Sequence, residues 1–163
     1  MNLTDFRFKI DRMLERTLIA LMGIMVINVL WQVFTRFILK DPSSYTEELA
    51  RYLLVWLGLL GASYAVGKKL HLAIDILTSK LIARRKQVSD IFINCCVFVF
   101  SFGVIFIGGM NLVSLTLDLQ QTSAALQIKL GYVYSVVPLS GLLMMFYAGS
   151  SIIESIKNFK EVA

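Results

Sequence analysis

Two groups of side chains in this sequence have types and spacing that could support chemistry. Glu47 and Glu48 precede Arg51 by four and three residues, so on a helix either carboxylate can reach the guanidinium. His71 and Asp75 are also four residues apart and can pair in the same way. A metal site would need further ligands, and no second His and no Cys lies near His71. The spacing therefore indicates placement and partner contacts more strongly than catalysis.

Catalytic chemistry has little support elsewhere in the chain. The sequence has one His, and its two Cys residues, Cys95 and Cys96, are adjacent within an apolar run. In that setting they are expected to act as small apolar side chains rather than as a redox or metal-binding pair. The sequence therefore predicts no catalytic residue, no metal and no cofactor.

The composition indicates an integral membrane protein. Of 163 residues, 57% are hydrophobic and only two are Pro, and the mean hydropathy is +0.72. Spanning a bilayer as a helix takes roughly 20 apolar residues. Runs with little or no charge cover residues 17–35, 49–66, 91–117 and 130–153. We therefore predict an all-α membrane protein with one domain, residues 1–163, and four transmembrane helices at about 17–38, 45–67, 89–117 and 128–153.

The basic residues predict how the four spans are oriented. Twelve of the sixteen Lys and Arg residues precede the first span, separate the second from the third, or follow the fourth. The other four are Arg36, Lys40, Arg51 and Lys129. The positive-inside rule then places both termini in the cytoplasm of a bacterial inner-membrane protein. The net charge of +5 reflects this topology and does not indicate nucleic-acid binding.

Two segments have the pattern of amphipathic helices at the membrane surface. Apolar residues recur at helical spacing among basic ones in residues 4–16, which are expected to continue into the first span. A second apolar stripe covers about residues 69–83, followed by Arg84, Arg85 and Lys86. These charges would be attracted to anionic lipid headgroups.

The opposite side of the membrane has two polar connections. The first is a tight turn around Pro42, and the second is the segment DLQQTSAALQIK between the third and fourth spans. Exposed polar residues there are candidates for contact with a soluble partner: Lys40, Asp41, Ser43, Asp118, Gln120 and Gln121. A kink is expected near Pro138 in the fourth span.

The second span has two unlike faces. Ser44 and Glu47 have the spacing of a capping box, so the helix is expected to begin there. One face has charged and small residues: Glu47, Glu48, Arg51, Gly58, Ala62 and Ala65. The opposite face has Leu49, Leu53, Trp56, Leu60 and Tyr64. The first face suits a protein partner and the second suits lipid.

The charges at the start of the second span fit an inter-subunit contact or an interfacial cap with a snorkelling arginine. Asn28, in the first span, can bond within its own bundle or to a partner.

The stretch EELARYLLVWLGLLGASYAVGKKLHLAID resembles the signature of the small membrane subunit of TRAP transporters, the DctQ-like family. The matching residues are Glu47, Glu48, Ala50, Arg51, Trp56, Gly67, His71 and Asp75. A second stretch, TSAALQIKLGYVYSVVPLSGLLMM, is similar to another block of that family at Ser123, Leu126, Tyr134, Pro138 and Gly141. It departs from the family pattern at Ala124, where a proline often stands.

The resemblance implies one subunit of a three-component secondary transporter for an organic acid such as sialic acid or a dicarboxylate. It implies a stable heterodimer with a large permease subunit driven by a sodium gradient, and transient contact with a periplasmic substrate-binding protein. The residues agree with a scaffold role, because no acid lies at mid-membrane and no pair of broken helices indicates a substrate site. Two alternatives stay open: a self-sufficient small homo-oligomeric transporter, for which Arg51 is the one candidate coupling charge, and a small membrane enzyme.

Overall fold

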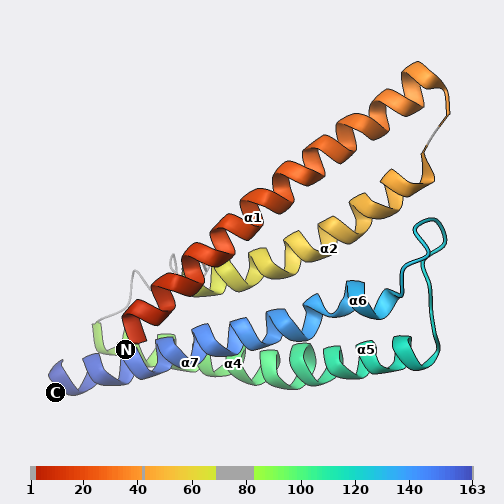
Figure 1. Ribbon diagram of the computed structural model, residues 1–163. Coiled ribbons are helices and arrows are strands. Elements are labelled where there is room, and N and C mark those ends of the chain that lie inside the picture. The colour runs from red at the N-terminus through yellow and green to blue at the C-terminus, as the bar shows by residue number, and fades with distance from the viewer. Residues whose placement is uncertain (1–2, 42, 69–82, 163) are drawn as a thin grey trace.

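The computed structural model describes residues 3–41, 43–68 and 83–162, which are mostly helical (Figure 1). In chain order the elements are α1 (Leu3–Phe34), η1 (Thr35–Leu39), α2 (Ser44–Gly67), α4 (Ala83–Phe100), η2 (Ser101–Ile107), α5 (Gly108–Asp118), α6 (Leu130–Tyr134) and α7 (Val136–Val162). In these ranges four helical stretches are long and apolar enough to cross a membrane: Asp5–Leu39, Ser44–Gly67, Val88–Asp118 and Leu130–Ile156. The prediction of an all-α protein with four spans is confirmed.

The first span is one continuous rod. The segment predicted as a surface helix, residues 4–16, runs without a break into the apolar part of α1, as expected. At the far end the helix widens into the π-helical turn η1, and Lys40 ends it in the left-handed conformation at φ 56°. The 32 residues of α1 measure about 48 Å at 1.5 Å per residue. This length exceeds the hydrocarbon thickness of a bilayer, so α1 must tilt or extend beyond it.

The capping box predicted at the start of α2 is wrong. Ser43, not Ser44, is the residue before the first helical turn, and its side chain makes no capping hydrogen bond. Instead the Thr46 hydroxyl donates to the Ser43 carbonyl at 2.9 Å. The Glu47 carboxylate accepts a hydrogen bond from Arg51 at 3.2 Å.

The prediction that the bulky face of α2 meets lipid is also wrong. Leu60 is only 3% exposed and belongs to a core with Leu14, Val136 and Tyr147. Trp56 and Tyr64 pack against the same core. The helical period separated the two faces correctly. It could not tell which one points inward, because lipid chains and protein side chains are equally apolar.

The fourth span is at the centre of the fold. Half of its most apolar stretch is buried within the protein, against 17% for the second span and 6% for the first and third. α7 packs against α2, α4 and η2, while α1 packs mainly on α2 (Figure 1). The span is interrupted at Ser135, between α6 and α7. Pro138 explains the break, because it has no N–H to donate and its ring crowds the carbonyl four residues earlier. A kink was predicted near Pro138, and the structure has an interruption of the helix three residues before it.

Glycines allow α7 and the third span to approach closely. A Cβ atom added to Gly141 would lie 2.9 Å from the backbone nitrogen of Phe106 in η2. A Cβ added to Gly109, at the start of α5, would lie 2.9 Å from the backbone nitrogen of Pro138. At both points backbone meets backbone, so side-chain rotation cannot make room for a larger residue.

A polar cluster joins three spans at the end of the bundle where both termini lie (Figure 1). We call it the terminal junction; its members are Arg7, Asp11, Gly67, Lys68, Tyr147 and Glu154. The Asp11 carboxylate accepts hydrogen bonds from the Tyr147 hydroxyl at 2.6 Å and the Lys68 ammonium at 3.0 Å. Arg7 donates to the Gly67 carbonyl at 2.6 Å and lies 3.7 Å from the Glu154 carboxylate. The hydrogen bond to Asp11 raises the pKa of the Lys68 ammonium above its usual value.

Candidate partner interface

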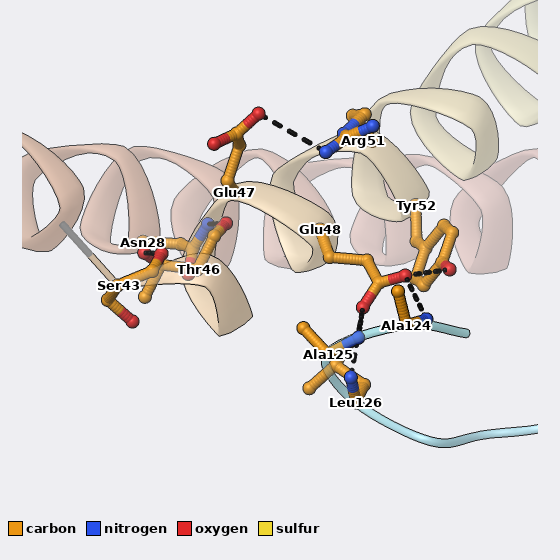
Figure 2. A network of polar contacts seen from close by, with 10 residues as sticks. All are labelled: Asn28, Ser43, Thr46, Glu47, Glu48, Arg51, Tyr52, Ala124, Ala125 and Leu126. Atoms are coloured by element: carbon orange, nitrogen blue, oxygen red, sulfur yellow. Dashed lines mark hydrogen bonds and ion pairs between the residues drawn. The ribbon is translucent and has the colours of Figure 1, made fainter.

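The two adjacent acids at the start of α2 point in different directions (Figure 2). Glu47 pairs with Arg51 at 3.2 Å, and their side chains are 61% and 70% exposed. Glu48 instead turns towards the connection between α5 and α6. The predicted three-residue cluster is therefore two separate features: an exposed ion pair, and a carboxylate committed to contacts within this chain.

Five hydrogen-bond donors surround the Glu48 carboxylate. They are the hydroxyls of Tyr52 and Ser123 and the backbone N–H groups of Ala124, Ala125 and Leu126. Tyr52 makes the shortest contact, at 2.7 Å, and the Ala125 amide lies at 2.8 Å. Successive backbone N–H groups that converge in this way form an anion-binding concavity, or nest. Here an anion from α2 fills the nest (Figure 2).

Ala124 supplies one of these donors at a position where the sequence comparison with the DctQ-like pattern favoured a proline. Its N–H lies 3.2 Å from the Glu48 carboxylate. A proline has no N–H and could not make this bond. The sequence departure thus adds a third backbone donor to the nest.

The predicted docking residues lie at the end of the bundle opposite the termini (Figure 1). Lys40 and Asp41 are exposed beyond η1, and Ser43 is half-buried. Asp118, Gln120 and Gln121 are exposed where α5 leads into the connection to α6. The structure thus places both sets at one end of the molecule and leaves most of these side chains accessible.

The remaining predicted interface residues divide between surface and interior. Gly58 and Ala62 are exposed, and a Cβ on Gly58 would meet nothing within 4 Å. Ala65 is half-buried. Trp56 is a contact within the chain, because its indole N–H donates to the Val133 carbonyl in α6 at 3.0 Å. The exposed part of the small-residue face therefore consists of Gly58 and Ala62, on the same helix as the Glu47–Arg51 pair.

His71 and Asp75 lie outside the described residues, as does most of the predicted surface helix at about 69–83. Their pairing stays a prediction. In the part of the chain that the structure describes, no group of three or more His, Cys, Asp or Glu side chains is placed to bind a metal ion.

Two further contacts involve residues of α1; the first was one of two alternatives left open by the sequence, and the second was not predicted. Asn28 donates to the Thr46 carbonyl at 2.8 Å, which resolves its open alternatives in favour of a bond within the bundle (Figure 2). Asp11 pairs with Tyr147, 136 residues away. Asp11 is an acid within a basic amphipathic segment, and this was the signal in the sequence that it could form a polar contact. Nothing in the sequence identified Tyr147 as its partner.

Replacing Trp56 by Phe tests the contact between α2 and α6. The change keeps an aromatic ring and removes the N–H, so we expect a loss of about 1 kcal/mol in stability. The measurement is the thermal unfolding midpoint of the purified protein in detergent. Trp31→Phe is the matched control, because Trp31 is 54% exposed and its ring stacks on the neighbouring Phe34 of the same helix. Equal midpoints for the two variants would contradict the prediction.

Comparison with known proteins gives a consistent result. Residues 25–158 match the family described as "Tripartite ATP-independent periplasmic transporters, DctQ component". The chain is 33% identical over 141 residues to the sialic acid TRAP transporter permease protein SiaT of Haemophilus influenzae, covering 85% of this chain and 21% of that protein. It is 35% identical over 81 residues to the sialic acid TRAP transporter small permease protein SiaQ of Vibrio cholerae, covering 50% of this chain and 47% of that protein.

A third relative is named for a different substrate. The C4-dicarboxylate TRAP transporter small permease protein DctQ of Rhodobacter capsulatus is 29% identical over 102 residues, covering 63% of this chain and 44% of that protein. The matches thus span about a fifth of the SiaT length and about half of the length of the two small permease proteins.

Proposed function

This chain belongs to the DctQ component family of tripartite ATP-independent periplasmic (TRAP) transporters, and from that premise we propose that it scaffolds a large permease subunit in a stable heterodimer. It is a multi-pass inner-membrane protein and a small TRAP permease subunit. The observation that carries the proposal is the family match over residues 25–158, which includes all or part of each of the four spans.

The match to SiaT supports the choice of partner. This chain aligns with only 21% of that permease protein, so most of SiaT lies outside the matched part. We propose that the partner of this chain is a separate subunit that corresponds to the unmatched, larger part of SiaT. In this proposal the pair takes up an organic acid with a sodium gradient, and a periplasmic binding protein delivers the acid by transient contact at the end with Lys40 and Gln120.

The buried polar groups favour a scaffold over a self-sufficient transporter. In the described ranges all buried polar residues are uncharged, with Asn28, Ser63 and Ser140 as examples. Charged side chains within the membrane commonly mark ion and proton pathways in transporters. Arg51, the one candidate, has a side chain that is 70% exposed and pairs with Glu47 in the first turns of α2. The relatives are transporter subunits, which also favours a non-enzymatic role.

Orientation and domain organisation complete the proposal. We place both termini in the cytoplasm, following the charge distribution, and treat residues 1–163 as a single membrane domain. The terminal junction then faces the cytoplasm, and the exposed polar connections face the periplasm.

Arg51→Ala tests the contact with the permease. The Arg51 side chain is 70% exposed in this chain and available to a partner. We expect its loss to weaken association with the co-expressed permease about fivefold, which corresponds to roughly 1 kcal/mol of binding free energy. The amount of permease recovered by affinity purification of this chain across a salt series measures the effect. Arg36→Ala is the control, because Arg36 is an exposed arginine on η1, outside the proposed face.

Unchanged association and undiminished uptake in Arg51→Ala would remove Arg51 from the proposed interface. The scaffold role itself has a separate test. If the chain purified alone forms a stable homo-oligomer that transports an organic acid in liposomes, the self-sufficient alternative is correct.

A further inference from the structure

The connection between α5 and α6, residues 119–129, is a small ordered hairpin. Backbone bonds close it: the Ser123 N–H donates to the Ile128 carbonyl, and the Leu130 N–H donates to the Gln121 carbonyl, both at 2.9 Å. Thr122 and Lys129 form an isolated antiparallel bridge. We call residues 119–129 the outer hairpin. Its fold is local, so these bonds do not by themselves fix its position relative to the spans.

Glu48 supplies a connection from the outer hairpin to another span. Its carboxylate accepts from the Ser123 hydroxyl and from three successive backbone N–H groups at residues 124–126. These partners lie 75 to 78 residues away in the sequence. Hydrogen bonds to an ionised acceptor are stronger than neutral ones, and they fix the geometry of the donors. The tip of the outer hairpin is therefore tied to the first turns of α2.

The same turn of α2 is also tied to α1. Asn28 donates to the Thr46 carbonyl at 2.8 Å, two residues before Glu48. Asn28 is only 8% exposed, so this contact is inside the protein. The two contacts link α1, α2 and the outer hairpin at one end of the bundle (Figure 2). The hairpin is thereby placed in a fixed relation to the spans that hold it.

The outer hairpin nevertheless leaves much of its surface accessible. Gln120, Gln121 and Thr122 on one strand and Gln127 and Lys129 on the other are exposed. Gln120 lies in the first turn and Gln127 directly follows the second, and they have positive φ angles of 48° and 52°. These accessible groups are amides, a hydroxyl and an ammonium, and the apolar Leu119 and Ile128 of the same hairpin are also exposed. Such a surface suits a water-soluble partner that forms hydrogen bonds rather than a helix within the membrane.

We infer that Glu48 is a positioning residue for docking, because it holds the outer hairpin in the shape that a periplasmic substrate-binding protein contacts. The inference rests on the proposed function and adds a specific role for one residue of the family motif. Pre-ordering a loop removes the entropy cost that binding would otherwise include. Loss of the carboxylate therefore weakens capture of the binding protein and leaves the transport step after capture unchanged.

The test uses the complex of this chain with its large permease in liposomes, with purified binding protein loaded with substrate outside. Uptake is measured over a range of binding-protein concentrations. Glu48→Gln replaces one carboxylate oxygen by an NH2 group, which opposes the N–H donors of the nest. We expect the half-saturating concentration of binding protein to rise about fivefold, with the maximal uptake rate and the amount of assembled complex unchanged.

Two further variants sharpen the result. Ser123→Ala removes a single donor and leaves α2 intact, so a rise of about twofold is expected; it also tests the inference if Glu48→Gln fails to assemble. Glu15→Gln is the control, because Glu15 is an exposed acid of α1 outside both proposed surfaces. The control is expected to match the wild type in both parameters.

Three outcomes separate the explanations. An unchanged half-saturating concentration in Glu48→Gln and Ser123→Ala would overturn the inference. A lower maximal rate with the half-saturating concentration unchanged would also overturn it, because that result belongs to a residue that serves only folding or assembly. If the wild-type complex shows no uptake that depends on the binding protein, the proposed function fails. In that case hydrogen exchange at the N–H groups of residues 124–126 still tests whether Glu48 holds the outer hairpin. An exchange rate that Glu48→Gln does not change would overturn the positioning role of Glu48.

Discussion

Replacing Gly141 by Leu is expected to destabilise the protein by about 3 kcal/mol, because it forces α7 away from η2. The first atom added, Cβ, would lie 2.9 Å from the backbone nitrogen of Phe106, 3.1 Å from its Cα and 3.2 Å from the carbonyl carbon of Ile105. Backbone atoms within a helix cannot rotate away as a side chain can. The whole third span would have to move, and α7 would lose packing along the interface that buries it.

The thermal unfolding midpoint of the purified protein in detergent measures this effect. Gly103→Leu is the matched control, since Gly103 lies in η2 and a Cβ there would meet nothing within 4 Å. The control is expected to keep the wild-type midpoint within a few degrees. If both variants unfold at the same temperature, close approach at Gly141 does not contribute to stability.

Asp11→Ala is expected to open the terminal junction and to cost about 2 to 3 kcal/mol. The substitution removes the acceptor of the Tyr147 hydroxyl and of the Lys68 ammonium. Tyr147 is fully buried, so its hydroxyl would be left without the partner that now offsets its loss of water. The Tyr147 ring cannot simply shift, because the Gly67 backbone lies against it so closely that a Cβ on Gly67 would be 2.7 Å from the ring.

A double-mutant cycle tests this explanation. Tyr147→Phe combined with Asp11→Ala removes both ends of the hydrogen bond, so it should recover part of the stability lost in Asp11→Ala. Asp5→Ala is the control, because Asp5 is an exposed acid on the same helix. Purely additive losses in the cycle would show that the two side chains do not interact.

The four spans could be predicted from the sequence because bilayer thickness sets the length of each apolar run. The interruption before Pro138 was also predictable, since it follows from the local geometry of proline. The sequence could not predict which face of α2 points into the protein. Helical period placed Leu60 and Gly58 on different faces, but choosing the buried one requires knowing where the other helices lie.

Local pairs in the candidate interface were predictable, and long-range pairs were not. The Glu47–Arg51 contact joins residues four apart and is confirmed at 3.2 Å. Glu48 has the same residue type and nearly the same spacing, yet its carboxylate binds N–H groups 76 to 78 residues away. Backbone N–H groups belong to every residue except proline, so no pattern of side chains marks a nest in advance.

The terminal junction has a consequence for the order in which the chain is made. Asp11 and Tyr147 are separated by 136 positions, so the bond between them cannot form until α7 has been synthesised. At a bacterial translation rate of about 5 to 20 residues per second, this delay is roughly 7 to 27 seconds. Until then Arg7 and Asp11 lack their α7 partners Glu154 and Tyr147. The end of α1 at the terminal junction is therefore completed late, and any subunit assembly that depends on this junction follows translation of α7.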